Sequence, residues 1–145
     1  MPEMPEIQAH AERLTDRFAG RRLSAFTPFN FTALKTAVPA PSEAYGYPLI
    51  GVGRRWKYLL LEFEPVTFVV HLMQGGRLRP DPTQATRPRG GLARWAYDDG
   101  SALLLTEAGK DHKAGVWVVD GDPETAEPLA HLGPDADSVD VDELA

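Results

Sequence analysis

The sequence contains no cysteine among its 145 residues. Without thiols the chain can form no disulfide, no thiolate zinc site and no cysteine redox centre. It also lacks a long apolar run, since no segment approaches the roughly 18 consecutive apolar residues that a membrane span needs. The acidic start does not have the basic and apolar pattern of a leader peptide. The composition therefore predicts a cytoplasmic protein without membrane association.

Lys and Arg are absent from the C-terminal end of the chain. Residues 120–145 carry nine Asp or Glu and no Lys or Arg, whereas residues 1–119 carry 15 Lys or Arg against 12 Asp or Glu. The net charge of −6 therefore belongs to the tail, and the body is mildly basic, with a group formed by Arg54, Arg55, Lys57, Arg77 and Arg79. Such a body suits weak contact with phosphate groups. We predict one domain over residues 1–119 and an acidic linker over residues 120–145.

Periodicity predicts one helix followed by many short strands. Apolar residues recur at helical spacing between Pro5 and Phe18. Alternating or continuous apolar segments bounded by turn residues predict strands over 22–26, 29–35, 49–55, 57–63, 67–73, 92–97, 101–106 and 115–119, with 77–79 as a continuation of the strand before it. Ser42 is expected to cap a short helix before Gly46. The predicted class is α+β: a β-sandwich of about eight mostly antiparallel strands with an N-terminal helix packed against it.

The first three residues carry a possible nucleophile. Removal of Met1 would leave Pro2 with a free secondary amine, which can attack a carbonyl-like carbon and form an iminium. Glu3 beside it is suited to proton transfer. The alternative is that the segment is an ordinary flexible start and that Pro5 only opens a helix.

Four motifs in this order resemble the landmarks of the formamidopyrimidine-DNA glycosylase and endonuclease VIII family. They are Met-Pro-Glu-Met-Pro-Glu-Ile at 1–7, Arg-Arg-Trp-Lys-Tyr-Leu-Leu-Leu at 54–61, His-Leu-Met-Gln-Gly-Gly-Arg-Leu at 71–78 and Leu-Gly-Pro at 132–134. The resemblance covers the N-terminal catalytic domain of that family. In the family, Leu-Gly-Pro opens a second domain with a helix-two-turn-helix region and a zinc finger or its equivalent. We expect no cofactor in this chain, with any zinc finger in a missing C-terminal part.

The resemblance implies a bifunctional DNA glycosylase and lyase that acts as a monomer on damaged double-stranded DNA, near the nucleoid in a bacterium. Pro2 would attack C1′ of the flipped-out damaged nucleotide, and Glu3 would move protons. Lys57, the third residue of the catalytic set, and His71 would contact phosphates next to that nucleotide. The other substrate-binding candidates are Glu6 at the lesion pocket, and Gln74 and Arg77 from the same motif as His71. No metal-ligand set is expected.

Two features keep alternatives open. Lys57 is predicted to begin a strand, where a lysine is often only solvated, and His71 is as compatible with the core as with a ligand. The residues that fill the hole left by a flipped base in many family members are also replaced, because Gln74, His112 and Ala114 stand where methionine, arginine and phenylalanine are expected. The chain is thus also compatible with a catalytically silent DNA-binding or structural fragment, or with a small-molecule enzyme that uses Pro2 as a base.

Overall fold

The computed structural model describes residues 4–30, 32–36, 38–72, 75–108, 114–121, 123 and 129. One helix, α1 (Met4–Phe18), precedes eight strands, and a 3-10 helix, η1 (Pro41–Ala44), lies between the first two of them. The strands are β1 (Leu23–Pro28), β2 (Gly51–Arg55), β3 (Tyr58–Glu62), β4 (Thr67–His71), β5 (Gly76–Pro80), β6 (Gly91–Tyr97), β7 (Ala102–Glu107) and β8 (Gly115–Val119).

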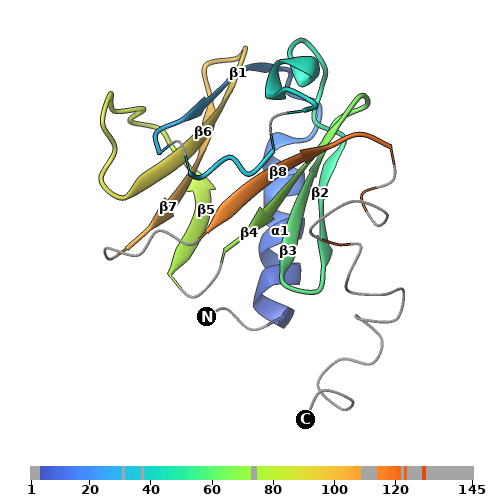
Figure 1. The fold of residues 1–145 in the computed structure, drawn as a ribbon, viewed down its shortest axis with the longest axis horizontal. Coiled ribbons are helices and arrows are strands. Elements are labelled where there is room, and N and C mark those ends of the chain that lie inside the picture. Colours follow the sequence, from blue (N-terminus) through green and yellow to red (C-terminus); the bar gives the residue numbers. More distant parts are fainter. Residues whose placement is uncertain are drawn as a thin grey trace.

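Two four-stranded antiparallel sheets form the sandwich (Figure 1). Their strand orders are β1-β6-β7-β5 and β2-β3-β4-β8. Aromatic side chains from both sheets meet in the core: Phe68 of β4 lies 5.4 Å from Phe26 of β1 and 5.7 Å from Trp95 of β6, between ring centroids. The predicted fold class, a β-sandwich with an N-terminal helix, is confirmed.

Helix α1 closes the side of the sandwich where β2 and β5 are the edge strands. Its buried face consists of Ile7, Ala11, Leu14 and Phe18, as the periodicity predicts. Two polar side chains on the same helix bind strand backbones. The Thr15 hydroxyl accepts a hydrogen bond from Val52 N–H of β2 at 2.8 Å, and His10 Nε2 donates to the carbonyl oxygen of Leu78 in β5. The helix is therefore fixed to one strand of each sheet.

The outer face of the β2-β3-β4-β8 sheet carries a second apolar cluster. Tyr58, Leu60, Val69 and Val119 are buried there, and Trp56 and Trp117 pack against them. Such a face needs a cover, because buried apolar surface is stable only when water is excluded from it. Leu129, which is 1% exposed, belongs to this cluster. Part of the predicted acidic linker therefore contacts the sandwich.

Four local predictions are wrong, and the fourth, for the segment 77–79, is described in the next paragraph. The described residues of 29–35 form no strand: the Asn30 side chain accepts a hydrogen bond from Thr32 N–H at 3.0 Å, a local bond that competes with strand pairing, and Leu34 forms only an isolated bridge to Val116. Lys57 does not begin a strand but lies in the turn between β2 and β3. Ser42 is inside η1, whose N-cap is Ala40 and carries no side-chain cap bond.

The segment 77–79 does not continue β4 but belongs to β5 in the other sheet. The chain passes from one sheet to the other between Leu72 and Gly76, and Gly76 N–H donates a hydrogen bond to Leu72 O at 2.8 Å. A Cβ at Gly76 would lie 2.2 Å from that oxygen, so only glycine fits. Within the described part of the chain, no helix has the length and apolar character of a bilayer span.

Candidate functional site

A cleft of about 340 Å³ opens beside the first turns of α1. Its lining comes from α1, from the end of β4 and from β5: Glu6, Ile7, His10, Leu72, Arg77, Leu78 and Arg79. Two predicted substrate-binding residues, Glu6 and Arg77, therefore line one cavity. Pro2, Glu3 and Gln74 lie outside the described residues. The cleft combines a carboxylate with two guanidinium groups next to the helix start that follows Pro2 and Glu3 in the sequence.

His10, a polar residue that the sequence analysis did not identify, also lines this cleft. Burial lowers the pKa of His10, the hydrogen bond to Leu78 O opposes that shift, and the charge of Arg13 adds to it. Because a carbonyl oxygen only accepts, Nε2 of His10 carries the proton. The neutral imidazole with its proton on Nε2 thus supports the cleft wall at neutral pH.

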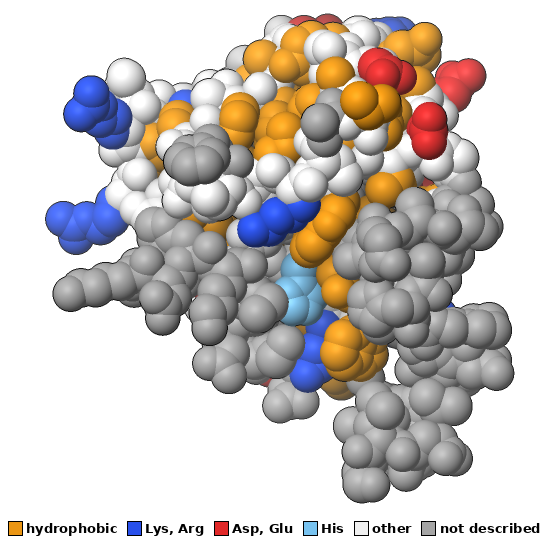
Figure 2. All heavy atoms as spheres, in the orientation of Figure 1, with side chains coloured by type: hydrophobic (Ala, Val, Ile, Leu, Met, Phe, Trp, Pro, Cys, Tyr) orange, Lys and Arg blue, Asp and Glu red, His pale blue; other side chains and the backbone are white. Residues whose placement is uncertain are grey.

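Lys57 and His71 come together at the end of the outer sheet face. His71 pairs with Tyr58 across β3 and β4, and the two ring centroids are 4.6 Å apart. Burial lowers the pKa of His71, and the nearby charge of Lys57 lowers it further. Figure 2 shows the molecule from the side where β8 lies in front of α1, and basic and hydrophobic side chains adjoin one another on that side. A neutral His71 beside a charged Lys57 forms a donor pair suited to phosphate oxygens.

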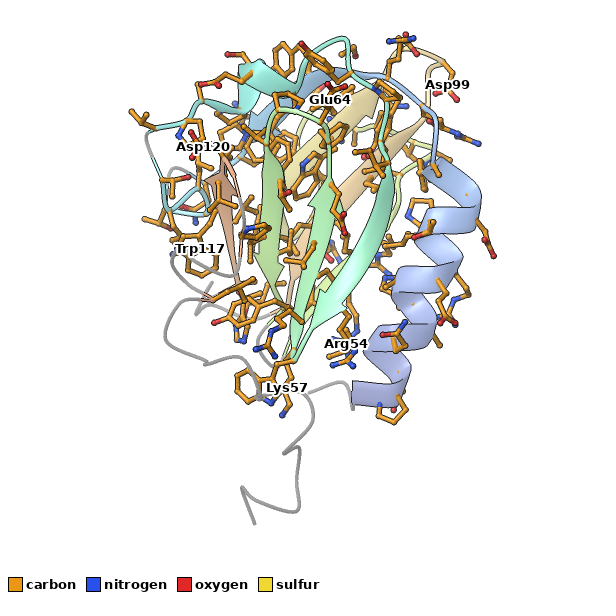
Figure 3. All side chains as sticks on the ribbon, turned by 90° about the vertical axis from the view of Figure 1, so that its right-hand side faces the viewer. Arg54, Lys57, Glu64, Asp99, Trp117 and Asp120 are labelled. Atoms are coloured by element: carbon orange, nitrogen blue, oxygen red, sulfur yellow. The ribbon has the colours of Figure 1, made fainter. Side chains whose placement is uncertain are left out.

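Hydrogen bonds of Arg54 connect α1 with the turn that contains Lys57. Its Nε donates to Gln8 Oε1 at 3.0 Å, and its NH1 group donates to Trp56 O at 2.9 Å. Figure 3 shows Arg54 and Lys57 at the same end of the molecule as the start of α1. The sequence analysis assigned Arg54 only to a basic group. The hydrogen bond of Arg54 to α1 depends on the contact between α1 and β2, which the motif Arg-Arg-x-Lys does not predict.

Trp56, directly before Lys57, has a backbone conformation that large residues avoid. Its φ is +54°, in the left-handed region. For a residue with a side chain this costs roughly 1–2 kcal/mol. The Lys57 ammonium lies 5.5 Å from the centroid of the Trp56 ring, a cation–π contact. The turn therefore presents an aromatic ring and a positive charge together.

A second, more basic groove of about 610 Å³ lies on the other side of β5. Its charged walls are Arg77, Arg79 and Arg89, and its floor is formed largely by Gly75, Gly90 and Thr106. The one carboxylate in its lining, Glu107, is 5% exposed and accepts a hydrogen bond from Ala114 N–H at 2.9 Å. Arg77 lines both this groove and the cleft. The sequence analysis did not identify Arg89, which lies between β5 and β6, outside the predicted strands.

Ala114 is 1% exposed and part of the main core. This is the position where the resemblance leads us to expect a phenylalanine that helps to fill the hole left by a flipped base. An alanine that is buried in the core cannot fill that hole. Among the described residues, no group of three His, Asp or Glu side chains could hold a metal ion.

The fold is thus a β-sandwich whose N-terminal helix is hydrogen-bonded to both sheets, with a cleft that contains two arginines beside the first turns of that helix. The family model of the formamidopyrimidine-DNA glycosylase N-terminal domain matches residues 1–110. The chain belongs to the formamidopyrimidine-DNA glycosylase family.

Relatives and solved structures agree with this assignment. The chain is 31% identical over 137 residues to the formamidopyrimidine-DNA glycosylase of Thiobacillus denitrificans and 33% identical over 141 residues to that of Geobacter sulfurreducens. Each match covers 93% of this chain and 49% of the relative. The Lactococcus lactis enzyme, bound non-covalently to DNA with an AP site, has the same fold: the TM-score is 0.75 at 19% identity, over 90% of this chain and 48% of that one.

A MutM structure in complex with DNA containing carbocyclic 8-oxo-G gives a TM-score of 0.76 at 19% identity, again over 90% of this chain and 48% of that one. The chain thus spans about half the length of the curated relatives it matches.

Proposed function

We propose that this chain is the catalytic domain of a base-excision-repair DNA glycosylase and AP lyase that acts on damaged double-stranded DNA. Two observations carry the proposal: Glu6 and Arg77 line one cleft beside the first turns of α1, and Lys57, whose charge acts on His71, lies at the same end of the molecule as the start of that helix. Membership of the glycosylase family supports it. The start of α1 follows directly after Pro2 and Glu3, which would carry the chemistry.

The proposed reaction begins with removal of Met1. The lone pair of the Pro2 amine attacks C1′ of the extruded nucleotide, and the glycosidic bond breaks with its electrons on the leaving base. Glu3 protonates the ring oxygen, which opens the sugar and leaves an iminium between Pro2 and C1′. Loss of the C2′ proton expels the 3′ phosphate, and a second elimination expels the 5′ phosphate. The strand is thereby cut on both sides of the lesion.

The remaining residues would bind the substrate. Lys57 and His71 offer one charged and one neutral donor to the phosphates beside the extruded nucleotide. Glu6 and Arg77 would face the damaged base from the two walls of the cleft. Gln74 is proposed as a contact to the gap in the duplex. The absence of a cofactor, the monomeric state and the cytoplasmic, nucleoid-associated location stay predictions.

Borohydride trapping on a duplex with one abasic site tests the proposal, with the intact mass recorded on the same sample. The expected result is a covalent adduct on Pro2 in protein that lacks Met1. One alanine inserted before Pro2 should abolish the adduct, because the nitrogen is then an amide. An adduct that persists in the blocked protein would exclude Pro2 as the nucleophile. No adduct despite a free Pro2 would favour the second candidate, a silent DNA-binding fragment, which the buried Ala114 supports.

A further inference from the structure

Two described residues other than glycine have a positive φ, Trp56 at +54° and Gln84 at +50°. Gln84 has local hydrogen bonds that favour its conformation, since its backbone N–H binds Asp81 Oδ1 at 3.2 Å and its side-chain amide binds Gly100 O at 2.7 Å. Glycine would adopt the Trp56 conformation without steric cost. We therefore expect the Trp56 side chain to have a function that offsets the strain of its backbone, since strained residues cluster at functional sites.

The surroundings hold the Trp56 ring in a defined place. Its ring centroid lies 6.4 Å from that of Tyr58, and its carbonyl oxygen accepts the hydrogen bond from Arg54. The side chain is half-buried, and the Lys57 ammonium lies beside the ring. A preorganised indole next to a cation combines the two elements of single-stranded nucleic-acid recognition, a stacking surface for a base and a charge for its phosphate.

We propose that Trp56 is a stacking platform for an unpaired nucleobase, beside the phosphate held by Lys57. This inference rests on the proposed function. A base that has lost its partner to extrusion exposes a π-face, and an aromatic ring covers that face in any base sequence. Ala114 has no aromatic ring, and its methyl group is buried in the core. Trp56 supplies an aromatic surface from a different element, the turn between β2 and β3.

Trp117 distinguishes this role from simple packing. It belongs to the same apolar cluster, and its ring centroid lies 6.2 Å from that of Tyr58. Trp117 lies within β8 and pairs with Val69 in regular register. It therefore needs only a packing role, and substitution of Trp117 reports on the cluster without changing the turn.

The test compares Trp56→Gly, Trp56→Phe, Trp117→Phe and Gln84→Gly by fluorescence anisotropy on a labelled duplex with one abasic-site analogue. A 2-aminopurine opposite the analogue reports stacking. We expect Trp56→Gly to bind roughly 5- to 150-fold more weakly, the range that one lost base–aromatic stack gives, and to lose the quenching of 2-aminopurine. Trp56→Phe should retain both, and the other two variants should bind like the wild type.

The thermal midpoint of Trp56→Gly should stay close to that of the wild type, because relief of the strained φ offsets the lost packing. Wild-type binding and quenching by Trp56→Gly would overturn the stacking role while leaving the proposed function intact. Equal weakening by Trp117→Phe would also overturn it, since the effect would then belong to the cluster. A wild-type chain that neither binds nor is trapped would overturn the proposed function and this inference with it.

Discussion

His10 of α1 donates a hydrogen bond from Nε2 to the carbonyl oxygen of Leu78, on the free edge of β5. The bond joins the helix that follows Pro2 to the strand that carries Arg77 and Arg79. It therefore connects the two walls of the cleft, and its loss should be measurable in stability as well as in function.

His10→Ala should lower the free energy of unfolding by about 1 kcal/mol at pH 7.5, the usual net contribution of one hydrogen bond. The pKa of His10 is lowered in the folded state, mainly by burial. Its neutral form therefore favours folding above about pH 6.5, the pKa of an unfolded histidine, and this contribution is lost as the pH falls through the lower folded pKa.

Urea unfolding of wild type and His10→Ala between pH 5 and 7.5 measures this contribution. The variant should lose less stability on acidification, although His71, whose pKa is lowered in the same direction, retains its own share. Equal losses in the two proteins would contradict a role for His10. Ser24→Ala, at an exposed hydrogen bond to Ala96 O, serves as the control.

Thr15→Val should destabilise the protein by about 1–3 kcal/mol, because Val52 N–H would lose its acceptor in a partly buried place. Valine and threonine have similar shapes and helix propensities, so the change isolates the hydroxyl group. Chemical denaturation measures it. Thr32→Val, at an exposed hydroxyl, should have little effect, and a similarly small effect at Thr15 would refute the proposed fixation of α1 to β2.

Arg79→Gln and Arg89→Gln should each reduce the salt dependence of duplex binding. If each guanidinium in the groove beside β5 contacts one phosphate, the slope of log K against log salt falls in magnitude by about 0.9 per variant. Titrations at several salt concentrations provide the slope. Arg22→Gln is the control, because its guanidinium binds Gly46 O elsewhere. Unchanged slopes for both groove variants would remove this groove from the DNA-contact surface.

Leu129→Ala should cost about 2–5 kcal/mol, the range for a fully buried leucine. Leu129 covers the outer face of the β2-β3-β4-β8 sheet, and its exposed fraction is only 1%. Denaturant unfolding compares it with Ile50→Ala, at a residue that is 60% exposed. Equal denaturation midpoints for Leu129→Ala and Ile50→Ala would show that another segment covers the outer face of this sheet.

The sequence predicts those features that depend on neighbouring residues. The buried face of α1 and most strands of the sandwich follow from spacing, and β8 has the predicted bounds 115–119. The transfer of β5 to the other sheet could not be predicted, because it depends on close packing of Gly76 against Leu72. Residues 29–35 were mistaken for a strand because their pattern does not show that Asn30 would bind the backbone.

In the candidate site, too, sequence motifs predict some residues, whereas the contacts between distant segments depend on the tertiary structure. Glu6, Lys57, His71 and Arg77 could be nominated from motifs, whereas the proximity of Lys57 to His71 follows from the pairing of Tyr58 with His71. His10 and Thr15 look like solvent-facing polar residues in a helical pattern, and only the tertiary structure turns them toward strand backbones. The left-handed conformation of Trp56 could not be predicted from its residue type, because tryptophan normally avoids a positive φ.

The bonds of His10 and Thr15 to separate sheets set a constraint on chain length. Eight positions separate Pro2 from His10 in the sequence. One residue inserted into α1 before His10 would rotate the beginning of the helix by about 100° relative to both sheets, given about 3.6 residues per turn. Insertions and deletions in this interval should therefore be excluded from functional variants, even where substitutions are tolerated. The hydrogen bonds of His10 and Thr15 thus determine which face the first turn of α1 presents to the cleft.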